Sequence, residues 1–398
     1  MHVTGWFKDR IGRRRMSCSA AYETAKCKNA ERAKRHRADE SGRVDYYPRY
    51  IQLEQTNRCQ ARCIMCNHFI LGNRGSSDLN PAVIDALKPA LPFCEVLMLN
   101  GDGEPFLCAD IAHHLELYSH YGVRVGTNTN LCYVTEEFWG VLAEHISFLN
   151  ISCDAADAER FELIRQGLSF DSFVKNLERL SIEAPKMRKH LDCVVMRQNI
   201  DQLVDLVDFA ANHHMASVRF HRLGVNPCIG NDADADDLFP AYASKMFERA
   251  ERRARERGIA IEVPAHGFFG DVSRPDLGDV LSWRAELPAR RRRGERMCAD
   301  RSLASDYLSE PIVAAKLTEG AWRCHGGCAW AWERCYVDMQ GNVSTCCFNV
   351  RKRMGNLMEQ TFDEIWNGEP YRELRRMMMN NKLPNWCSSC AWIRTPRF

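Results

Sequence analysis

From residue 48 onward, short apolar runs alternate with longer stretches in which apolar positions recur at helical spacing. The apolar runs predict strands at Tyr50–Leu53, Val96–Leu99, Val123–Gly126, Ile146–Ile151, Leu191–Met196 and Val218–Leu223. The amphipathic stretches predict helices at 81–90, 109–121, 135–144, 156–165, 171–183 and 201–213. This alternation favours an α/β fold with a parallel sheet and helical crossovers, and six such units make a partial (β/α)6 TIM-like barrel.

The pattern changes on both sides of this repeat. After it come a long polar helix at 240–257 and a short strand at Ile259–Val263. Near the C-terminus, the turn at Gln340–Asn342 predicts a β-hairpin, and a helix is predicted at 361–379. The expected organisation is a basic, solvated N-terminal extension at 1–47, a core at 48–264, a linker at 265–321 and a small C-terminal domain at 322–398.

Composition narrows the class of protein. The chain has 398 residues, of which 45% are hydrophobic and 27% are charged, and these values are ordinary for a globular protein. The net charge of +2 argues against nucleic acid as the main partner. No apolar run approaches the roughly 20 residues that span a bilayer, and no secretory signal is visible. We therefore expect a cytoplasmic protein with no membrane partner.

Cysteine is the unusual residue, with 19 in the chain. Cytosolic proteins rarely keep disulfides, so clustered cysteines there favour metal ligands. Single cysteines more often act as small buried hydrophobic residues. We expect this second role for Cys94, Cys132, Cys153 and Cys193.

The first cluster is Cys59-Gln-Ala-Arg-Cys63-Ile-Met-Cys66, directly after the first predicted strand. Three thiolates on one loop can ligate three irons of a cubane cluster, which leaves the fourth iron open to a small molecule. A zinc knuckle with His68 as the fourth ligand is the alternative.

Polar motifs follow the predicted strands one after another. In parallel α/β barrels, active sites form at the carboxyl ends of the strands. Each motif alone also fits a turn or a structural hydrogen bond. The residues concerned are Gly101, Asp102, Gly103, Glu104, Asn128, Ser152, Asp154, Asn199, His221 and Arg222.

Together, the cysteine triplet and these motifs resemble the radical S-adenosylmethionine (SAM) superfamily over most of residues 48–398. The resemblance implies a [4Fe–4S] cluster that is held by Cys59, Cys63 and Cys66 and that binds SAM. One departure lies in the loop, where Met65 stands at a position that is often aromatic in the family.

The same resemblance implies which residues contact SAM. Gly101–Pro105 looks like the family's Gly-Gly-Glu-Pro motif with Asp102 inserted, and the family uses this segment for the amino group of SAM. Ser152-Cys-Asp154 is similar to the family's Ser-x-Asp, and Arg165 fits the arginine that holds the SAM carboxylate with that serine. Asn199 is expected to reach the nucleoside.

The second cluster of cysteines lies in the C-terminal domain. The hairpin is expected to hold Cys328 and Cys346 at the ends of its strands, and Cys387 and Cys390 follow the helix. Four thiolates suit a zinc ribbon or a fully ligated [4Fe–4S] cluster. The spacing resembles the Twitch domain, the short form of the SPASM extension, which implies that these four residues ligate one auxiliary cluster. Cys335 or Cys347 is left open as a substitute ligand.

The resemblance implies that reductive cleavage of SAM gives a 5′-deoxyadenosyl radical, which abstracts a hydrogen atom from the substrate. An auxiliary cluster that accepts an electron favours a net oxidation. We expect a small sugar-like or aminocyclitol substrate, because the arm before residue 48 is too short for a peptide-binding winged-helix domain. The alternatives are a maturase that crosslinks or epimerises a ribosomally made peptide, and a zinc-ribbon binding module without catalysis.

Candidates for direct roles in the reaction are His221, Arg222 and Cys228. For His221 and Arg222, a substrate contact and a structural hydrogen bond are equally consistent with the sequence. A radical epimerase would need a thiol as hydrogen donor, for which Cys228 or Cys298 is available. The expected partner protein is an electron donor such as flavodoxin or ferredoxin.

Overall fold

The computed structural model describes residues 4–35, 38–66, 77–223, 240–264, 328–347, 350, 352–380, 382, 384 and 387. Within the first and fourth of these ranges, side chains are described from residues 20 and 242 onward. The expected linker at 265–321 lies outside the described residues.

Ten strands form one sheet in the order β12-β11-β10-β1-β3-β4-β5-β7-β8-β9, and β2 and β6 form a separate pair. The strands of the first part are β1 (Tyr50–Leu53), β2 (Arg62–Cys63), β3 (Val96–Met98), β4 (Arg124–Thr129), β5 (Phe148–Ser152) and β6 (Arg165–Gln166). Those of the second part are β7 (Arg188–Val195), β8 (Ser217–Arg222), β9 (Ala260–Glu262), β10 (Arg334–Val337), β11 (Asn342–Ser344) and β12 (Arg353–Asn356).

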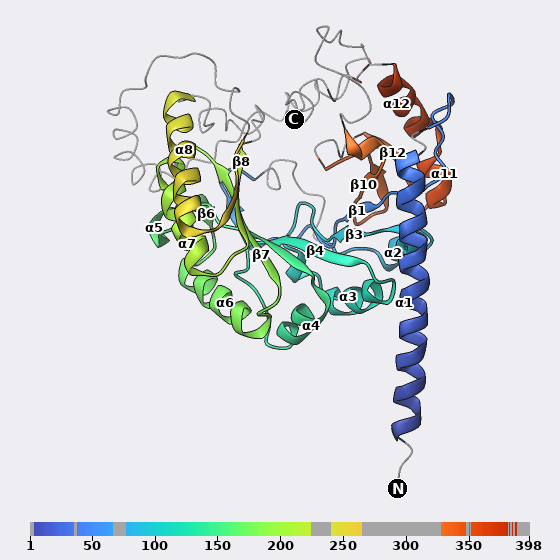
Figure 1. The fold of residues 1–398 in the computed structure, drawn as a ribbon, viewed down its shortest axis with the longest axis horizontal. Coiled ribbons are helices and arrows are strands. Elements are labelled where there is room, and N and C mark those ends of the chain that lie inside the picture. Colours follow the sequence, from blue (N-terminus) through green and yellow to red (C-terminus); the bar gives the residue numbers. More distant parts are fainter. Residues whose placement is uncertain are drawn as a thin grey trace.

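Helices cover the outer face of the curved sheet (Figure 1). They are α1 (Thr4–Arg35), α2 (Pro81–Leu87), α3 (Ile111–His120), α4 (Phe138–His145), α5 (Ala158–Ile164), α6 (Phe170–Glu183), α7 (Leu203–Asn212), α8 (Pro240–Arg257), α11 (Phe362–Trp366) and α12 (Glu369–Met379). Short 3-10 turns are η2 (Leu91–Phe93), η3 (Pro105–Leu107), η4 (Ile200–Gln202) and η8 (Ala329–Ala331).

In the large sheet, the neighbours from β1 through β3, β4, β5, β7 and β8 to β9 pair in parallel, as the alternation of strands and helices predicted. The separate pair β2 and β6 is antiparallel. Local sequence sets the start of several helices. The side chain of Asn80 caps α2, where Pro81 takes the first turn, and Ser169 caps α6. The partial barrel expected from the sequence is therefore confirmed.

The barrel interior is more polar than the predicted apolar strands suggested. Along β7, every second residue is fully packed against the helices, whereas Arg188, His190 and Asp192 lie on the other face. The observed strand thus begins three residues before the predicted one, because its polar positions belong to the barrel interior.

The C-terminal hairpin is not a separate sheet. Its first strand, β10, pairs in parallel with β1, and Cys335 lies opposite Ile51. The barrel sheet therefore continues into the C-terminal part, which was expected to stand apart. The helix predicted at 361–379 is divided at Asn367 and Gly368, because Pro370 has no amide hydrogen with which to continue α11.

The N-terminal extension also differs from the solvated arm that was expected. It forms the long helix α1, whose C-terminal half packs against η2 and α3 (Figure 1). Lys26 is buried and donates hydrogen bonds to the carbonyls of Tyr121, at 3.1 Å, and Gly122. Asn29 bonds the Tyr47 main chain through both its amide atoms, at 3.0 and 2.9 Å. A basic segment can thus form a helix that is fixed to the core, when a few of its polar side chains form hydrogen bonds with main-chain atoms there.

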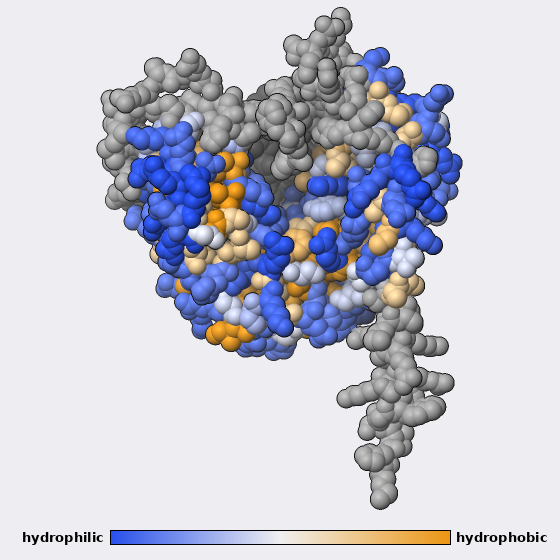
Figure 2. Space-filling view, viewed as in Figure 1, coloured by the Kyte–Doolittle hydropathy of each residue, from blue (hydrophilic) through white to orange (hydrophobic). Residues whose placement is uncertain are grey.

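The visible surface is mostly hydrophilic, and apolar residues show between polar ones in small groups (Figure 2). Among the described helices, none combines the length and the apolar character that crossing a membrane requires.

Candidate active site

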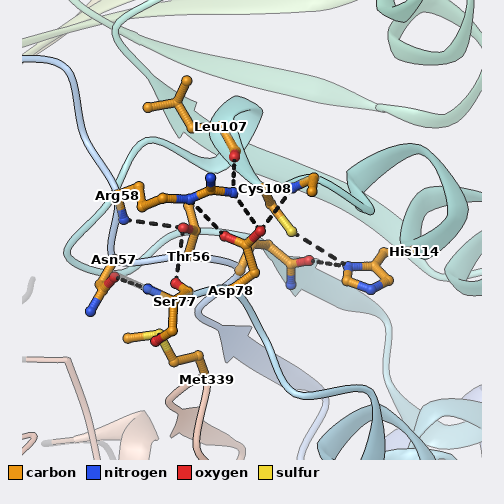
Figure 3. Close-up of polar contacts among 11 residues, drawn as sticks. Thr56, Asn57, Arg58, Ser77, Asp78, Leu107, Cys108, His114 and Met339 are labelled. Carbon is orange, nitrogen blue, oxygen red and sulfur yellow. Dashed lines mark hydrogen bonds and ion pairs between the residues drawn. The ribbon is translucent and has the colours of Figure 1, made fainter. Parts of the chain in front are cut away.

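The cysteine loop begins at a rigid anchor. Arg58, directly before Cys59, pairs with Asp78 at 2.5 Å and donates to the Leu107 carbonyl at 2.6 Å (Figure 3). Asp78 in turn accepts a hydrogen bond from the Ala109 amide at 3.0 Å. The chain therefore enters the loop from a fixed point between β1 and η3.

The middle of the loop is held by a short strand pair. Cys63 in β2 lies opposite Arg165 in β6, and Arg165 Nη1 is 3.9 Å from Cys63 Sγ. The Cys66 amide donates to the Cys63 carbonyl at 3.1 Å, which turns the chain back on itself. This arrangement ties the middle of the loop to one buried guanidinium.

Burial raises the pKa of the Cys59 thiol to about 12, and the nearby Glu104, Cys63 and Cys66 contribute to the increase. Burial also raises the pKa of Cys63, although the charge of Arg165 opposes this. Within the described ranges, the structure does not bring three His, Cys, Asp or Glu side chains close enough to hold a metal ion. The three thiols thus share one loop and influence one another without converging.

Arg165 forms a buried ion pair with Asp154, at 2.7 Å. Asp154 is completely buried and also accepts a hydrogen bond from the Val194 amide at 2.7 Å. Burial raises its pKa, and the charge of Arg165 opposes the increase. Arg165 was expected to act with Ser152, which ends β5, whereas the structure pairs it with Asp154.

The amide of Asn199 is occupied within the fold. Its nitrogen donates to the carbonyls of Asp154 and Val194, each at 2.9 Å, and its oxygen accepts from the Met196 amide at 2.8 Å. These bonds fix the turn after β7. They contrast with the expectation that this side chain reaches the nucleoside.

The glycines after β3 allow a close approach to the segment before the cysteine loop. A Cβ atom on Gly101 would lie 2.4 Å from the Glu54 side chain, and one on Gly103 would lie 2.2 Å from the Thr56 carbonyl. Glu54 is buried and accepts a hydrogen bond from the Asp102 amide at 2.8 Å. Sequence reasoning missed Glu54, although an acidic residue directly after an apolar strand was a signal that could have found it.

Glu104 holds the loops after β3 and β4 together. Its carboxylate accepts hydrogen bonds from the Thr129 hydroxyl at 2.7 Å and the Asn130 amide at 2.8 Å, and only 3% of the residue is exposed. Burial raises its pKa to about 7, although these hydrogen bonds oppose the increase. The Glu104 carboxylate thus forms hydrogen bonds within the protein, whereas the sequence analysis predicted that it contacts SAM.

Replacing Glu104 with glutamine is expected to flatten the dependence of stability on pH. An unfolded glutamate loses its proton near pH 4.5, but folded Glu104 keeps it until about pH 7. The folded state therefore binds more protons between these values, and wild-type stability falls by about 3 kcal/mol as the pH rises through this window. Urea titrations from pH 4.5 to 8 measure the difference between wild type and E104Q. The exposed Glu159 supplies the control E159Q, which should follow the wild type, and identical curves for E104Q would contradict the assignment.

Further polar residues line the inner face of β4, β5, β7 and β8. Asn150 donates to Asn128 Oδ1 at 2.8 Å. His221 Nε2 lies 3.6 Å from Asp192 Oδ1, which also pairs with Arg219 at 2.7 Å. Asp192 and Arg219 were missed because both lie inside predicted strands, where a charged residue was itself the available signal.

The remaining candidates are spread over several places. Arg222, at the end of β8, is partly buried, and Cys228 lies outside the described residues. Cys94, Cys153 and Cys193 are fully buried, as expected. Cys132 is instead partly exposed, and burial of its thiol raises its pKa to about 12, although the charge of Arg165 opposes this.

The C-terminal cysteines lie close to the edge of the barrel sheet. Cys328 precedes η8, Cys346 follows β11, and both are partly exposed. Cys387 packs against the main core, whereas Cys390 and Cys298 lie outside the described residues. Cys335 is fully buried inside the core, so the alternative in which it substitutes as an auxiliary ligand does not fit the structure.

Comparison with known proteins identifies the family to which the chain belongs. The SPASM family, an iron–sulfur cluster-binding domain, matches residues 328–391. Mycofactocin maturase MftC of Mycolicibacterium smegmatis is 32% identical over 352 residues, which cover 86% of this chain and 76% of MftC. The chain is a radical SAM enzyme with a SPASM domain.

Solved structures of other proteins share the fold of this radical SAM enzyme. Streptococcus suis SuiB bound to the precursor peptide SuiA has a TM-score of 0.58 at 15% identity, over 88% of this chain and 70% of SuiB. The protein anSMEcpe with bound AdoMet has a TM-score of 0.57 at 17% identity, over 87% of this chain and 84% of that one. The fold class inferred from the sequence is confirmed by these likenesses.

As a radical SAM enzyme with a SPASM domain, the protein uses SAM, a [4Fe–4S] cluster and auxiliary iron–sulfur clusters as cofactors. This finding replaces the alternative of a zinc-ribbon module without catalysis. The donor atoms fit, because thiolates are the protein ligands of such clusters and three thiols share the loop beside Arg165. When bound, SAM and its cluster supply the radical that abstracts hydrogen.

Proposed function

We propose that this radical SAM enzyme is a maturase that abstracts a hydrogen atom from a peptide and leaves it oxidised or crosslinked. The observation that carries the proposal is the 32% identity with mycofactocin maturase MftC over 86% of the chain. The likeness in fold to SuiB, which was solved with its precursor peptide SuiA, supports a peptide in the same kind of barrel.

This proposal reverses the preference for a sugar-like or aminocyclitol substrate. That preference rested in part on the absence of a recognisable winged-helix domain before residue 48, which concerns how a peptide is recruited rather than the reaction itself. The identity with a maturase extends over the barrel in which the reaction takes place. We give that evidence more weight, because the site rather than its attachments decides the chemistry.

We infer that the two sets of cysteines have separate tasks. Cys59, Cys63 and Cys66 hold the cluster that binds SAM, beside the glycine loop at Gly101–Glu104. The match to the SPASM family begins at Cys328 and ends one residue after Cys390, which supports the auxiliary ligands Cys328, Cys346, Cys387 and Cys390. A small electron carrier such as flavodoxin or ferredoxin supplies the electron for SAM cleavage.

The test uses the cluster-loaded enzyme under anaerobic conditions with SAM and dithionite. The substrates are short peptides encoded near its gene, together with a panel of sugars and aminocyclitols. We expect one peptide to lose hydrogen, as seen by mass spectrometry, in step with the formation of 5′-deoxyadenosine. Peptide oxidation also classifies the enzyme as an oxidoreductase.

Two controls make the result decisive. Reactions without SAM should leave the peptide unchanged, and peptide labelled with deuterium at the modified carbon should transfer deuterium to 5′-deoxyadenosine. Turnover of a sugar or aminocyclitol, with every peptide unchanged, would refute the proposal. Exchange with solvent deuterium without loss of hydrogen would instead identify an epimerisation.

A further inference from the structure

The sheet curls so that strands far apart in its order face a common interior. Tyr50 lies in β1 and Arg219 in β8, with β3, β4, β5 and β7 between them in the sheet. Even so, the charge of Arg219, like that of Arg334, acts on Tyr50 and opposes the increase in the pKa of its hydroxyl group that burial causes. The charge of Arg219 thus reaches Tyr50 across the inside of the curved sheet, whose bend is visible in Figure 1.

Charged side chains of both signs lie in this interior. Arg334 stacks on the ring of Tyr50 at 4.9 Å. On the opposite side, burial and the charges of Arg219 and Arg188 lower the pKa of His190. The acidic groups that act on His190 are Asp192 and Glu262, of which Asp192 pairs with Arg219 at 2.7 Å. Asp192 in β7 and Glu262 in β9 lie opposite Arg219, so two carboxylates balance the charges of Arg219 and Arg188.

Two polar atoms in this region have no hydrogen-bond partner among the described residues. One is Arg219 Nη2, which is buried although Nε of the same guanidinium bonds Asp192. The other is Asn150 Oδ1, on a residue that is only 7% exposed. Asn150 lies opposite His190, and Asp192 lies opposite Arg219, in consecutive strand pairs. A buried donor and a buried acceptor without partners indicate a place where a ligand completes the bonding.

We propose that Arg219 is the anchor for a carboxylate group of the substrate inside the barrel, with Asn150 Oδ1 accepting a neighbouring N–H. This inference rests on the proposed function, because a peptide offers a carboxylate and an amide hydrogen close together. A guanidinium that is already held at Nε presents its remaining donors to a carboxylate in a fixed geometry. Asp192 orients Arg219 and at the same time weakens its attraction for anions.

The geometry predicts opposite effects for two neighbouring substitutions. R219Q removes the anchor and should weaken binding of a carboxylate by about tenfold or more. D192N keeps the anchor but removes a competing negative charge, so it should strengthen the same binding. R219K keeps the charge without the fork and should fall between wild type and R219Q. A residue with a merely structural role would not move binding in both directions.

Calorimetric titration of the cluster-loaded enzyme tests this with defined probes. Three pentapeptides of alanine are compared: one with a central glutamate and blocked ends, one with a free terminal carboxylate, and one with a central glutamine and blocked ends. Glutarate and inorganic phosphate are the small anions. We expect at least one carboxylate peptide to bind about tenfold tighter than the neutral peptide, and the better of the two identifies the source of the carboxylate.

Two further variants serve as controls for the effect of R219Q. R179Q changes an arginine of α6 on the outer helices, where it pairs with Glu136, and should leave all affinities unchanged. If R219Q alone fails to fold because Asp192 loses its partner, the double variant D192N/R219Q removes both charges and should still lose the preference for carboxylates. A preference for carboxylates that survives in R219Q or in D192N/R219Q would overturn the inference. So would equal binding of charged and neutral peptides by the wild type, or tighter binding of phosphate.

The two proposals can fail separately. Binding of glutarate that depends on Arg219, together with turnover of a sugar or aminocyclitol and no change in any peptide, would support the carboxylate anchor and refute the peptide substrate. Modification of a peptide by wild type and R219Q at equal rates and equal KM would support the maturase and refute the anchor.

Discussion

Replacing Cys66 with alanine is expected to reduce the formation of 5′-deoxyadenosine from SAM to background. The loop is held at Arg58 and at the β2–β6 pair, and Cys66 is bonded back to Cys63 through its amide. Alanine leaves these main-chain contacts in place and removes only the thiol. Two thiols cannot hold three irons, so the open iron that binds SAM is lost with the cluster. Anaerobic assays of 5′-deoxyadenosine and iron content measure the effect.

A thiol elsewhere on the surface supplies the control. Cys27 lies exposed on α1, far along the chain from the loop, so C27A should keep full activity and iron content. C66A should lose about half of the iron if one of two cubanes is missing, while its far-ultraviolet circular dichroism stays that of the wild type. Undiminished cleavage of SAM in C66A would remove Cys66 from the proposed ligand set.

The strands of the barrel could be predicted because burial dominates them. The first predicted strand, Tyr50–Leu53, coincides with β1, since three of its four residues are buried. The prediction was less accurate at β7, which begins with the exposed Arg188 and carries His190 on its polar face, because a search for apolar runs does not detect such positions. Asp192 and Arg219 were missed for the same reason. Both lie within strands that were predicted from their apolar residues alone.

Contacts between distant parts of the chain could not be predicted from residue patterns. Glu54 reaches the Asp102 amide, and β10 joins β1, only because the fold brings these segments together. The burial of Lys26 on α1 could not be predicted either, because in the sequence this residue is one of several cations in a basic run. Spacing identified the thiols of the cysteine loop, but the partners that hold that loop required the structure.

Arg165 joins the cysteine loop to the barrel, and its replacement by methionine should be strongly destabilising. R165M leaves the Asp154 carboxylate fully buried beside the Val194 amide without its counter-ion. Removing one partner of a buried ion pair costs about 3–5 kcal/mol. We expect this loss in the free energy of unfolding, measured by anaerobic urea titration.

The loss should also depend on pH, because Asp154 without Arg165 has a pKa raised by burial alone. A carboxyl group whose folded pKa is raised loses stability as the pH rises through that value, so R165M should recover part of its stability in acid. Titrations at about pH 5 and pH 8 compare the two conditions. A deficit that stays equal at both would show that the damage does not come from the buried charge.

The double variant D154L/R165M separates stability from function. Replacing a buried ion pair with apolar residues of similar size is often neutral, so the double variant should regain most of the lost stability. It should nevertheless bind SAM poorly, because Arg165 would no longer lie 3.9 Å from Cys63 Sγ to hold the loop. The expected contact of Arg165 with the SAM carboxylate would be lost as well. Equilibrium dialysis with labelled SAM on cluster-loaded protein measures this. A stable double variant with wild-type affinity for SAM would mean that the ion pair only supports the fold, and Arg165 would then leave the SAM site.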